Sequence, residues 1–404
     1  MFSKAWQQYL VVTGNYWAFT LTDGALRMLV VLHFYSLGYG ALAIAMLFLF
    51  YEFFGVVTNL VGGWLGARWG LNRTMQLGLG LQLIALGMLL VPEPMLTVIW
   101  VMAAQALSGI AKDLNKMSAK SAIKTLVPAD ASDKLLKWVA LLTGSKNALK
   151  GVGFFVGALL LSLVGFSGAV LSMLAVLAVI WLASFALLTT DLGQAKRKPK
   201  FKEIFSKSRA VNRLSAARLF LFAARDVWFV VAVPVFMSEV LGWDHWLVGS
   251  FMACWVIGYG VVQASSPAFI LRITDKINPE TLTVLAALLV AAPMSLLFAI
   301  LTYTDLPPMW PLVIGLVVFG LCFALNSALH SFLIVHYADQ DGVSMDVGFY
   351  YMANAAGRLL GTVLSGWLYQ TQGLAVCVMA SVVLLVLTAL ISLRLPTKPS
   401  QVSA

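Results

Sequence analysis

Charged residues are scarce in this chain, and acidic residues are the scarcest. Only 17 of the 404 residues are aspartate or glutamate, and charged residues of both signs make up 11% of the chain, against about one quarter in soluble domains. Such a composition excludes an ordinary soluble protein. What is present instead is apolar, because 61% of the residues are hydrophobic and the mean hydropathy is +0.90, as in an integral membrane protein.

Residues for redox, metal and covalent chemistry are equally scarce. The histidines have no metal-ligand spacing, and the chain contains no Walker loop, nucleophile elbow or zinc motif. The cysteines lie singly in apolar segments without the paired spacing of a disulfide framework, and we interpret them as packing residues: Cys254, Cys322 and Cys377. We therefore expect no enzyme activity, no catalytic residue, no cofactor and no bound metal.

Twelve apolar runs, each long enough to cross a hydrocarbon core of about 30 Å as a helix, occur along the chain. The opening string MFSKAWQQYL lacks a short apolar core with a small-residue cleavage site, so we expect the first helix to be retained. The sequence thus predicts an all-α integral membrane protein with transmembrane helices at 9–34, 41–65, 74–91, 95–122, 137–164, 167–190, 214–238, 246–270, 280–301, 311–336, 345–368 and 374–394.

Basic residues orient these helices, because lysine and arginine accumulate in cytoplasmic loops. The loops opposite to the cytoplasm contain no lysine or arginine, whereas the predicted cytoplasmic segments carry Lys4, Arg68, Arg73, Lys134, Lys137, Arg272, Lys276, Arg394 and Lys398. We expect a multi-pass protein with both termini in the cytoplasm. The net charge of +10 follows from this topology in a lipid bilayer and does not point to a nucleic-acid partner.

Two similar halves flank a basic segment. The string DLGQAKRKPKFKEIFSKSRAVNR carries eight lysine or arginine residues and is typical of a cytoplasmic linker attracted to anionic headgroups. On either side the sequence repeats weakly at an offset of 203 to 205 residues, so that Asp23 matches Asp226. The predicted division is an N-terminal six-helix bundle at 1–190, the linker at 191–213, and a C-terminal six-helix bundle with a short cytoplasmic tail at 214–404.

A parallel repeat of two six-helix halves indicates a major facilitator fold, in which substrate binds near the membrane midplane and access alternates. The string GGWLGARWGLNR resembles the G-x-L-x-D-R-x-G-R-R gating motif of that superfamily. Ala67 stands at the acidic position of the motif, so the charge that the usual latch uses is missing. The candidate gating-loop residues are Gly63, Arg68 and Gly70.

The predicted helices contain many ionisable residues, although an ionised side chain at the bilayer centre costs at least ~2.5 to 3.5 kcal/mol. Local pairing, such as Asp23 with Arg27 one turn later, neutralises part of the set. The carboxylates are Asp23, Glu52, Asp113 and Asp226, and the cations are Arg27, Lys112, Lys116, Lys146, Lys150, Arg218, Arg225 and Arg358. The cations outnumber the carboxylates by four. An anionic ligand would supply the missing negative charge.

A stripe of lysines occurs in the string GIAKDLNKMSAKSAIK, where four-residue spacing places them on one helical face. Taken alone, the stripe is typical of a solvated surface. Lys112 and Lys146, however, lie roughly 16 to 20 Å from one predicted cytoplasmic turn at 1.5 Å per residue, and two ammonium groups at one depth repel unless an anion bridges them. We expect Lys120 and Lys124 at the interface and take as substrate-binding candidates Lys112, Lys116, Lys146 and Lys150.

Arg27 and Arg225 occupy near-equivalent places in the first and seventh predicted helices, where planar guanidinium groups suit phosphate-like oxyanions. An anion clamp and local salt bridges with the neighbouring aspartates both stay open as interpretations. The eleventh helix adds two substrate-binding candidates, Asn354 and Arg358. Burial disfavours an ionised carboxyl group, so the proton-coupling candidates are Asp23, Glu52, Asp113 and Asp226.

Four strings are long and unusual for a facilitator: GNYWAFTLTDGALRMLVVLHF, FLFYEFFGVVTNLVGGWLGAR, GIAKDLNKMSAKSAIK and GSKNALKGVGFF. In these strings, and through most of its length, the chain resembles the ArsJ family of organoarsenical efflux permeases. The resemblance implies a bacterial inner (plasma) membrane protein that exports 1-arseno-3-phosphoglycerate and so confers arsenate resistance. It also implies a functional link to the glyceraldehyde-3-phosphate dehydrogenase that makes this anionic ester, for which oxyanion recognition rather than cysteine ligation is needed.

Two alternatives stay open. An organophosphate/phosphate antiporter, or another organic-anion exporter, would use the same charges. A transporter-like sensor or scaffold would use them only to hold helices together.

Overall fold

The computed structural model describes residues 4–38, 47–126, 132–188, 200–205, 208–243, 245–274, 277–339 and 342–396. Within these ranges the chain forms α-helices joined by short turns, with two 3-10 helices and no β-strand. Part of the predicted linker, at 191–199 and 206–207, lies outside the described residues, as do 41–46 of the second predicted helix. Lys276 and Lys398 also lie outside them.

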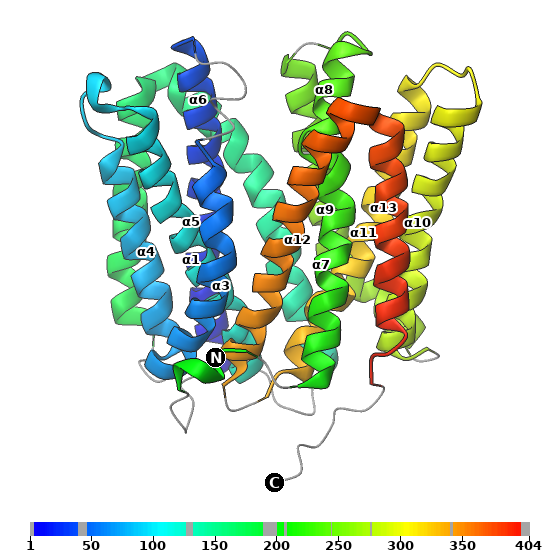
Figure 1. The fold of residues 1–404 in the computed structure, drawn as a ribbon. Coiled ribbons are helices and arrows are strands. Elements are labelled where there is room, and N and C mark those ends of the chain that lie inside the picture. The colour runs from blue at the N-terminus through cyan, green and yellow to red at the C-terminus, as the bar shows by residue number, and fades with distance from the viewer. Residues whose placement is uncertain are drawn as a thin grey trace. The chain divides into compact units, whose positions relative to one another are not determined.

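Figure 1 shows the helices in chain order. Their bounds are α1 Lys4–Ser36, α3 Leu49–Trp69, α4 Leu71–Met88, α5 Val98–Leu126, α6 Ser132–Leu187, α7 Arg209–Phe229, α8 Ala232–Glu239, α9 His245–Thr274, α10 Pro279–Tyr303, α11 Met309–Tyr337, α12 Val343–Gln372 and α13 Leu374–Ser392. The short 3-10 helices are η1, Glu93–Met95, and η2, Phe201–Glu203.

Each predicted transmembrane segment coincides with a described helix or with part of one. The long helix α6 contains two of them, because Gly165 has non-helical dihedral angles (φ 69°, ψ −177°) and turns the chain at the predicted boundary. Conversely, α7 and α8 are two parts of one predicted segment, interrupted at Val230 and Val231. The prediction of an all-α membrane fold is confirmed.

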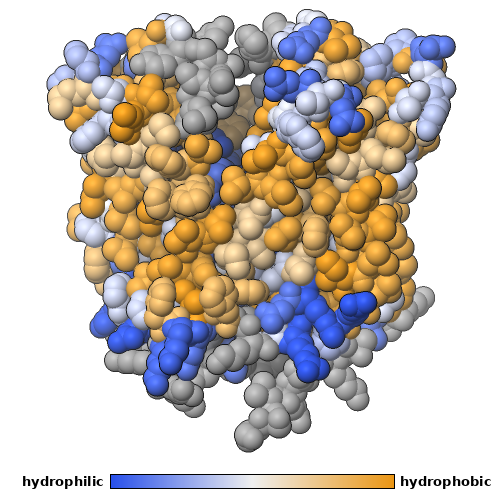
Figure 2. Space-filling model, viewed as in Figure 1, coloured by the Kyte–Doolittle hydropathy of each residue, from blue (hydrophilic) through white to orange (hydrophobic). Residues whose placement is uncertain are grey.

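Six of the described helical stretches are long and apolar enough to cross a membrane by composition alone; they lie in α6, α7 with α8, α9, α10, α11 and α13. The remaining long helices carry polar and charged side chains, and α1 and α5 contain several of the ionisable candidates. Figure 2 shows hydrophobic residues over the middle of the helices and hydrophilic residues gathered near helix ends. Polarity inside such a helix means that part of its surface faces protein or water rather than lipid.

Contacts divide the chain into two compact units. Unit 1 comprises 1–138, 145–206 and 338–352, and unit 2 comprises 139–144, 207–337 and 353–404. The helix α12 therefore contributes its first ten residues to unit 1 and the rest to unit 2. The boundaries of the predicted six-helix halves stay a prediction.

Unit 1 is built around α5, which packs against α1, α3 and α4. Glycine allows its helices to approach closely. A Cβ at Gly153 of α6 would lie 2.6 Å from the carbonyl oxygen of Leu21 in α1, and one at Gly109 of α5 would lie 2.6 Å from that of Tyr51 in α3. Small residues at such contacts are what membrane helices use to pack without a hydrophobic driving force.

Unit 2 has an aromatic core. Trp228 of α7 lies edge-on to Trp255 of α9 and to Phe319 of α11, with ring centroids 5.9 and 5.0 Å apart. Around this core α13 packs against α7 and α10, and α10 against α11. Edge-to-face pairs of this kind stabilise a core by about 0.5 to 1.5 kcal/mol beyond the effect of the area that they bury.

Candidate functional site

Asp113 of α5 is the centre of the charge cluster in unit 1. Its side chain is 1% exposed, and its carboxylate forms an ion pair with Lys116 one turn later and lies 3.8 Å from Lys112 Nζ. Gly55 of α3 makes room for it, since a Cβ there would meet Asp113 Oδ2 at 2.8 Å. One buried carboxylate is therefore shared by two ammonium groups.

The lysine stripe of α5 lies against tyrosine rings rather than in water. Lys112 Nζ is 3.7 Å from the centroid of the Tyr51 ring, and the Nζ atoms of Lys116 and Lys120 are 4.7 and 5.0 Å from that of Tyr351. Cation–π contacts stabilise each ammonium by ~0.5 to 2 kcal/mol. Lys120 is only 2% exposed, so the expectation that it reaches the interface is wrong: Tyr351 of α12 covers it.

The carboxylates of α1 and α3 pair differently from the sequence-based expectation. Arg27 Nη2 lies 3.3 Å from Glu52 Oε1 of α3, although Glu52 has no cation near it in sequence. Asp23 instead accepts hydrogen bonds of 2.7 and 2.9 Å from the hydroxyl of Tyr51. The predicted local pair between Asp23 and Arg27 is therefore replaced by contacts that join α1 to α3.

The two lysines predicted in α6 are half-buried. The backbone of Lys150 lies against α1, because a Cβ at Gly24 would be 2.7 Å from the Lys150 carbonyl oxygen. Next to Lys146, the hydroxyl of Ser145 accepts a 2.7 Å hydrogen bond from the Trp17 indole. Both lysines thus belong to the same unit as the α5 cluster, and their contact with substrate stays a prediction.

Asp226 of α7 has the corresponding role in unit 2. It is 1% exposed, and its Oδ1 accepts from Nε and Nη2 of Arg225 at 2.6 and 2.5 Å. Arg358 of α12 lies 3.4 Å from Oδ2. The local salt bridge that the sequence left open is present, but Asp226 is shared between two arginines, as Asp113 is shared between two lysines.

A second arginine of α7 makes a different set of contacts. Arg218, which is 3% exposed, donates from Nε to Asn354 Oδ1 at 2.8 Å and from Nη1 to Ser327 Oγ at 3.1 Å. Gln263 of α9 donates to the same hydroxyl at 3.1 Å. The guanidinium also lies 4.0 Å from the centroid of the Phe222 ring. The substrate-binding candidate Asn354 therefore also links α12 to α7 by a hydrogen bond.

Two polar residues next to this network escaped the sequence analysis. The imidazole of His330 and the amide of Asn326 lie one turn apart in α11, fully buried, and none of their side-chain polar atoms has a hydrogen-bond partner in the described part of the chain. Tyr51 and Tyr351 were missed as well. Aromatic and polar residues in apolar helices give no signal of their own, since only the packing partner reveals which of them face a charge.

The candidate gating loop lies where α3 meets α4. Gly70 joins the two helices with φ 94°, which favours glycine. A Cβ at Gly63 would lie 3.1 Å from the Cα of Gly348 in α12. The carbonyl of Gly63 accepts a 2.7 Å hydrogen bond from the hydroxyl of Ser344. Arg68 lies over the Trp64 ring at 5.3 Å. Their gating role stays a prediction.

No group of three or more metal-ligating side chains occurs among the described residues. The cysteines are all free. Cys377 is buried in the core of unit 2, as expected of a packing residue, whereas Cys254 is exposed on α9. The chemistry that these clusters can perform is binding: ammonium and guanidinium groups hold anions by charge and by hydrogen bonds.

Several solved structures share the fold of this chain. The proton:xylose symporter XylE is 15% identical with a TM-score of 0.75 over 97% of this chain and 96% of the other. The human organic anion transporter MFSD10 is 14% identical with a TM-score of 0.75 over 97% and 100%. A bacterial homologue of the iron transporter ferroportin is 11% identical with a TM-score of 0.79 over 98% and 100%.

Identities this low show a shared fold. The fold and its long apolar helices define a multi-pass membrane protein. The sequence profile of the Major Facilitator Superfamily matches residues 10–265 and 214–404, so the chain belongs to that superfamily. No match was found among curated proteins.

Proposed function

We propose that this transporter exports the anionic organoarsenical 1-arseno-3-phosphoglycerate by alternating access and thereby confers arsenate resistance. The observation that carries the proposal is the sharing of each buried aspartate, Asp113 and Asp226, between two basic side chains. One carboxylate neutralises one cation. In these described ion pairs two cations meet one carboxylate, and such an arrangement in a low-dielectric place would attract a multiply charged oxyanion.

The choice of oxyanion rests on the sequence resemblance described above. A phosphate and an arsenate ester at the two ends of one small molecule suit recognition by charge and hydrogen bonds, and no thiolate cluster is required. The substrate would be supplied by the glyceraldehyde-3-phosphate dehydrogenase that joins arsenate to glyceraldehyde 3-phosphate. In the proposed mechanism the basic candidates hold the two ends, while one of the buried carboxylates exchanges a proton.

The test uses everted membrane vesicles that contain the protein. The vesicles receive radiolabelled arsenate, glyceraldehyde 3-phosphate, NAD and the dehydrogenase, and arsenic accumulation is followed while each component is omitted in turn. Accumulation that requires all four is expected. Collapse of the pH gradient then tests proton coupling.

Two results would overturn the proposal. Uptake of phosphate or phosphoglycerate without arsenate or the dehydrogenase would identify an organophosphate/phosphate antiporter, especially if it requires phosphate on the opposite side. Absence of flux for all these compounds would leave the charges as helix-holding contacts.

A further inference from the structure

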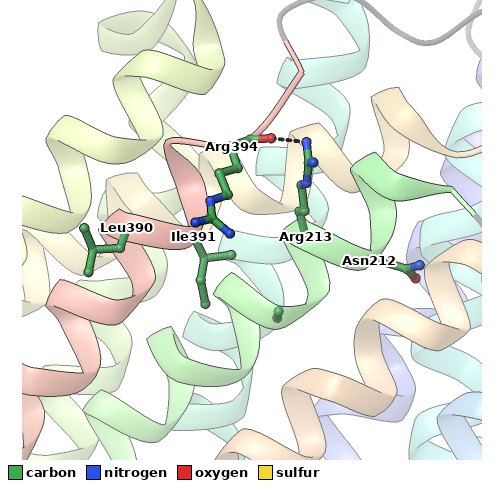
Figure 3. Close-up of a pocket in the computed structure, with 6 residues that line it drawn as sticks. Asn212, Arg213, Leu390, Ile391 and Arg394 are labelled. Atoms are coloured by element: carbon green, nitrogen blue, oxygen red, sulfur yellow. Dashed lines mark hydrogen bonds between the residues drawn. The ribbon is translucent and has the colours of Figure 1, made fainter.

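A hollow of about 410 Å³ lies between the first turns of α7 and the last turns of α13 in unit 2. It is lined by Asn212, Arg213, Ala216, Leu390, Ile391 and Arg394 (Figure 3). None of these residues belongs to the charge clusters described above. The hollow is therefore separate from the candidate substrate site.

Two arginines from different helices share this hollow. Arg213 Nη1 donates a 2.5 Å hydrogen bond to the backbone carbonyl of Arg394, and Figure 3 shows both side chains around the same space. In the described part of the chain neither guanidinium forms an ion pair with a carboxylate. Two cations brought together without a counter-ion repel each other, and an anion between them would remove that repulsion.

Apart from Asn212, the rest of the lining is apolar. It consists of Ala216, Ile391 and Leu390, and Leu390 is 54% exposed. An inorganic anion gains nothing from such a wall. A molecule with an anionic head and a hydrocarbon tail gains from both parts, because guanidinium groups bind phosphate by paired N–H donors and burial of the tail removes apolar surface from water.

We propose that this hollow binds one anionic phospholipid, with its phosphodiester between Arg213 and Arg394 and an acyl chain along α13. The location at helix ends is where anionic headgroups meet basic side chains of a membrane protein.

The proposal is tested with the full-length protein in nanodiscs of phosphatidylcholine containing about one fifth phosphatidylglycerol. After mild detergent extraction, native mass spectrometry counts the phosphatidylglycerol molecules retained. Arg394→Gln is the main variant, because its guanidinium makes no hydrogen bond within the described residues. The matched control is Arg209→Gln, which removes the same charge from an exposed position at the start of α7 outside the hollow.

We expect one retained lipid on the wild type, about fivefold less on Arg394→Gln, and wild-type retention on Arg209→Gln. Leu390→Gln keeps both arginines and is also expected to lower retention, since it removes part of the apolar wall. Equal loss from Arg394→Gln and Arg209→Gln would mean general surface attraction and would overturn the proposal. A second result would also overturn the proposal: millimolar inorganic phosphate displaces the lipid and stabilises the protein as much as the lipid does. The hollow would then be a site for a soluble anion.

Discussion

Each unit contains one buried aspartate that contacts two basic side chains, but the basic residues differ between the units. In unit 1 the buried aspartate Asp113 is shared by lysines, and in unit 2 the buried aspartate Asp226 is shared by arginines. The rings beside the cations differ too. Tyrosine lies under the lysines of α5, whereas phenylalanine lies under the arginines of α7, with Phe222 within 4.8 Å of Arg225.

The difference is one of rigidity. An ammonium is a compact charge on a flexible stem, while a guanidinium is a planar fork whose direction is fixed once two of its donors are bonded. Arg218 is fixed in this way by Asn354 and Ser327. The comparison teaches that unit 2 holds Arg218 in a set position, whereas the flexible lysines of unit 1 would suit the moving anion of the proposed function.

The largest expected effect is on transport and concerns Lys146 in unit 1. Lys146→Ala should abolish arsenical efflux without harming membrane insertion, since one of the ammonium groups proposed to hold the anion is lost. Arsenate resistance of cells, compared at equal expression, measures it. Normal resistance from a well-expressed variant would remove Lys146 from the site.

The next effect is on the stability of the α5 cluster. Asp113→Asn leaves two ammonium groups without their buried carboxylate, and breaking a buried ion pair from one side costs ~3 to 5 kcal/mol. We expect a clearly lower unfolding midpoint in detergent. The control is Asp133→Asn, at an exposed position early in α6, and a midpoint equal in both variants would show that the cluster is solvated.

A smaller effect on stability is expected when an arginine of unit 2 is replaced by lysine. Arg218→Lys keeps the charge but loses the fork that reaches Asn354 and Ser327, and hydrogen bonds of a charged group contribute ~1.5 to 3 kcal/mol. The unfolding midpoint should fall, whereas Arg209→Lys, at an exposed site, should leave it unchanged. A wild-type unfolding midpoint of Arg218→Lys would contradict the claim that the arginines of unit 2 are held more rigidly than the lysines of unit 1.

The smallest expected effect is on stability and compares the aromatic rings of Tyr351 and Phe222. Tyr351→Leu removes the ring contacts to Lys116 and Lys120, and loss of such cation–π contacts should cost ~0.5 to 2 kcal/mol. Phe222→Leu should cost less, since Arg218 keeps its hydrogen bonds to α11 and α12. Unfolding midpoints of the two variants decide the order, and the reverse order would contradict the comparison.

Much of the fold could be predicted from the sequence, because a membrane-spanning helix requires a long apolar run and most turns fell where such runs end. The predicted boundary between 164 and 167 falls at Gly165, where α6 turns, and the pair of Arg225 with Asp226 was one of the two interpretations left open. These are local features. They depend on a few neighbouring residues, which the sequence displays directly.

The contacts between helices could not be predicted in the same way. Spacing along α1 suggested Asp23 as the partner of Arg27, but Glu52 of α3 lies closer in space. Counting residues from a turn placed Lys120 at the interface, yet the ring of Tyr351, more than two hundred residues away, covers it. Both errors arise because packing, and not distance along the chain, decides which polar groups meet.

The central claim is that the second cation at each shared aspartate serves the substrate rather than the fold. Lys112→Gln leaves Asp113 paired with Lys116, and Arg358→Gln leaves Asp226 paired with Arg225. The most direct measurement is therefore the initial rate of arsenical uptake into everted vesicles by these two variants, with their unfolding midpoints measured alongside. The account predicts at least a tenfold lower rate with midpoints near the wild-type value. Wild-type uptake by both variants would contradict it.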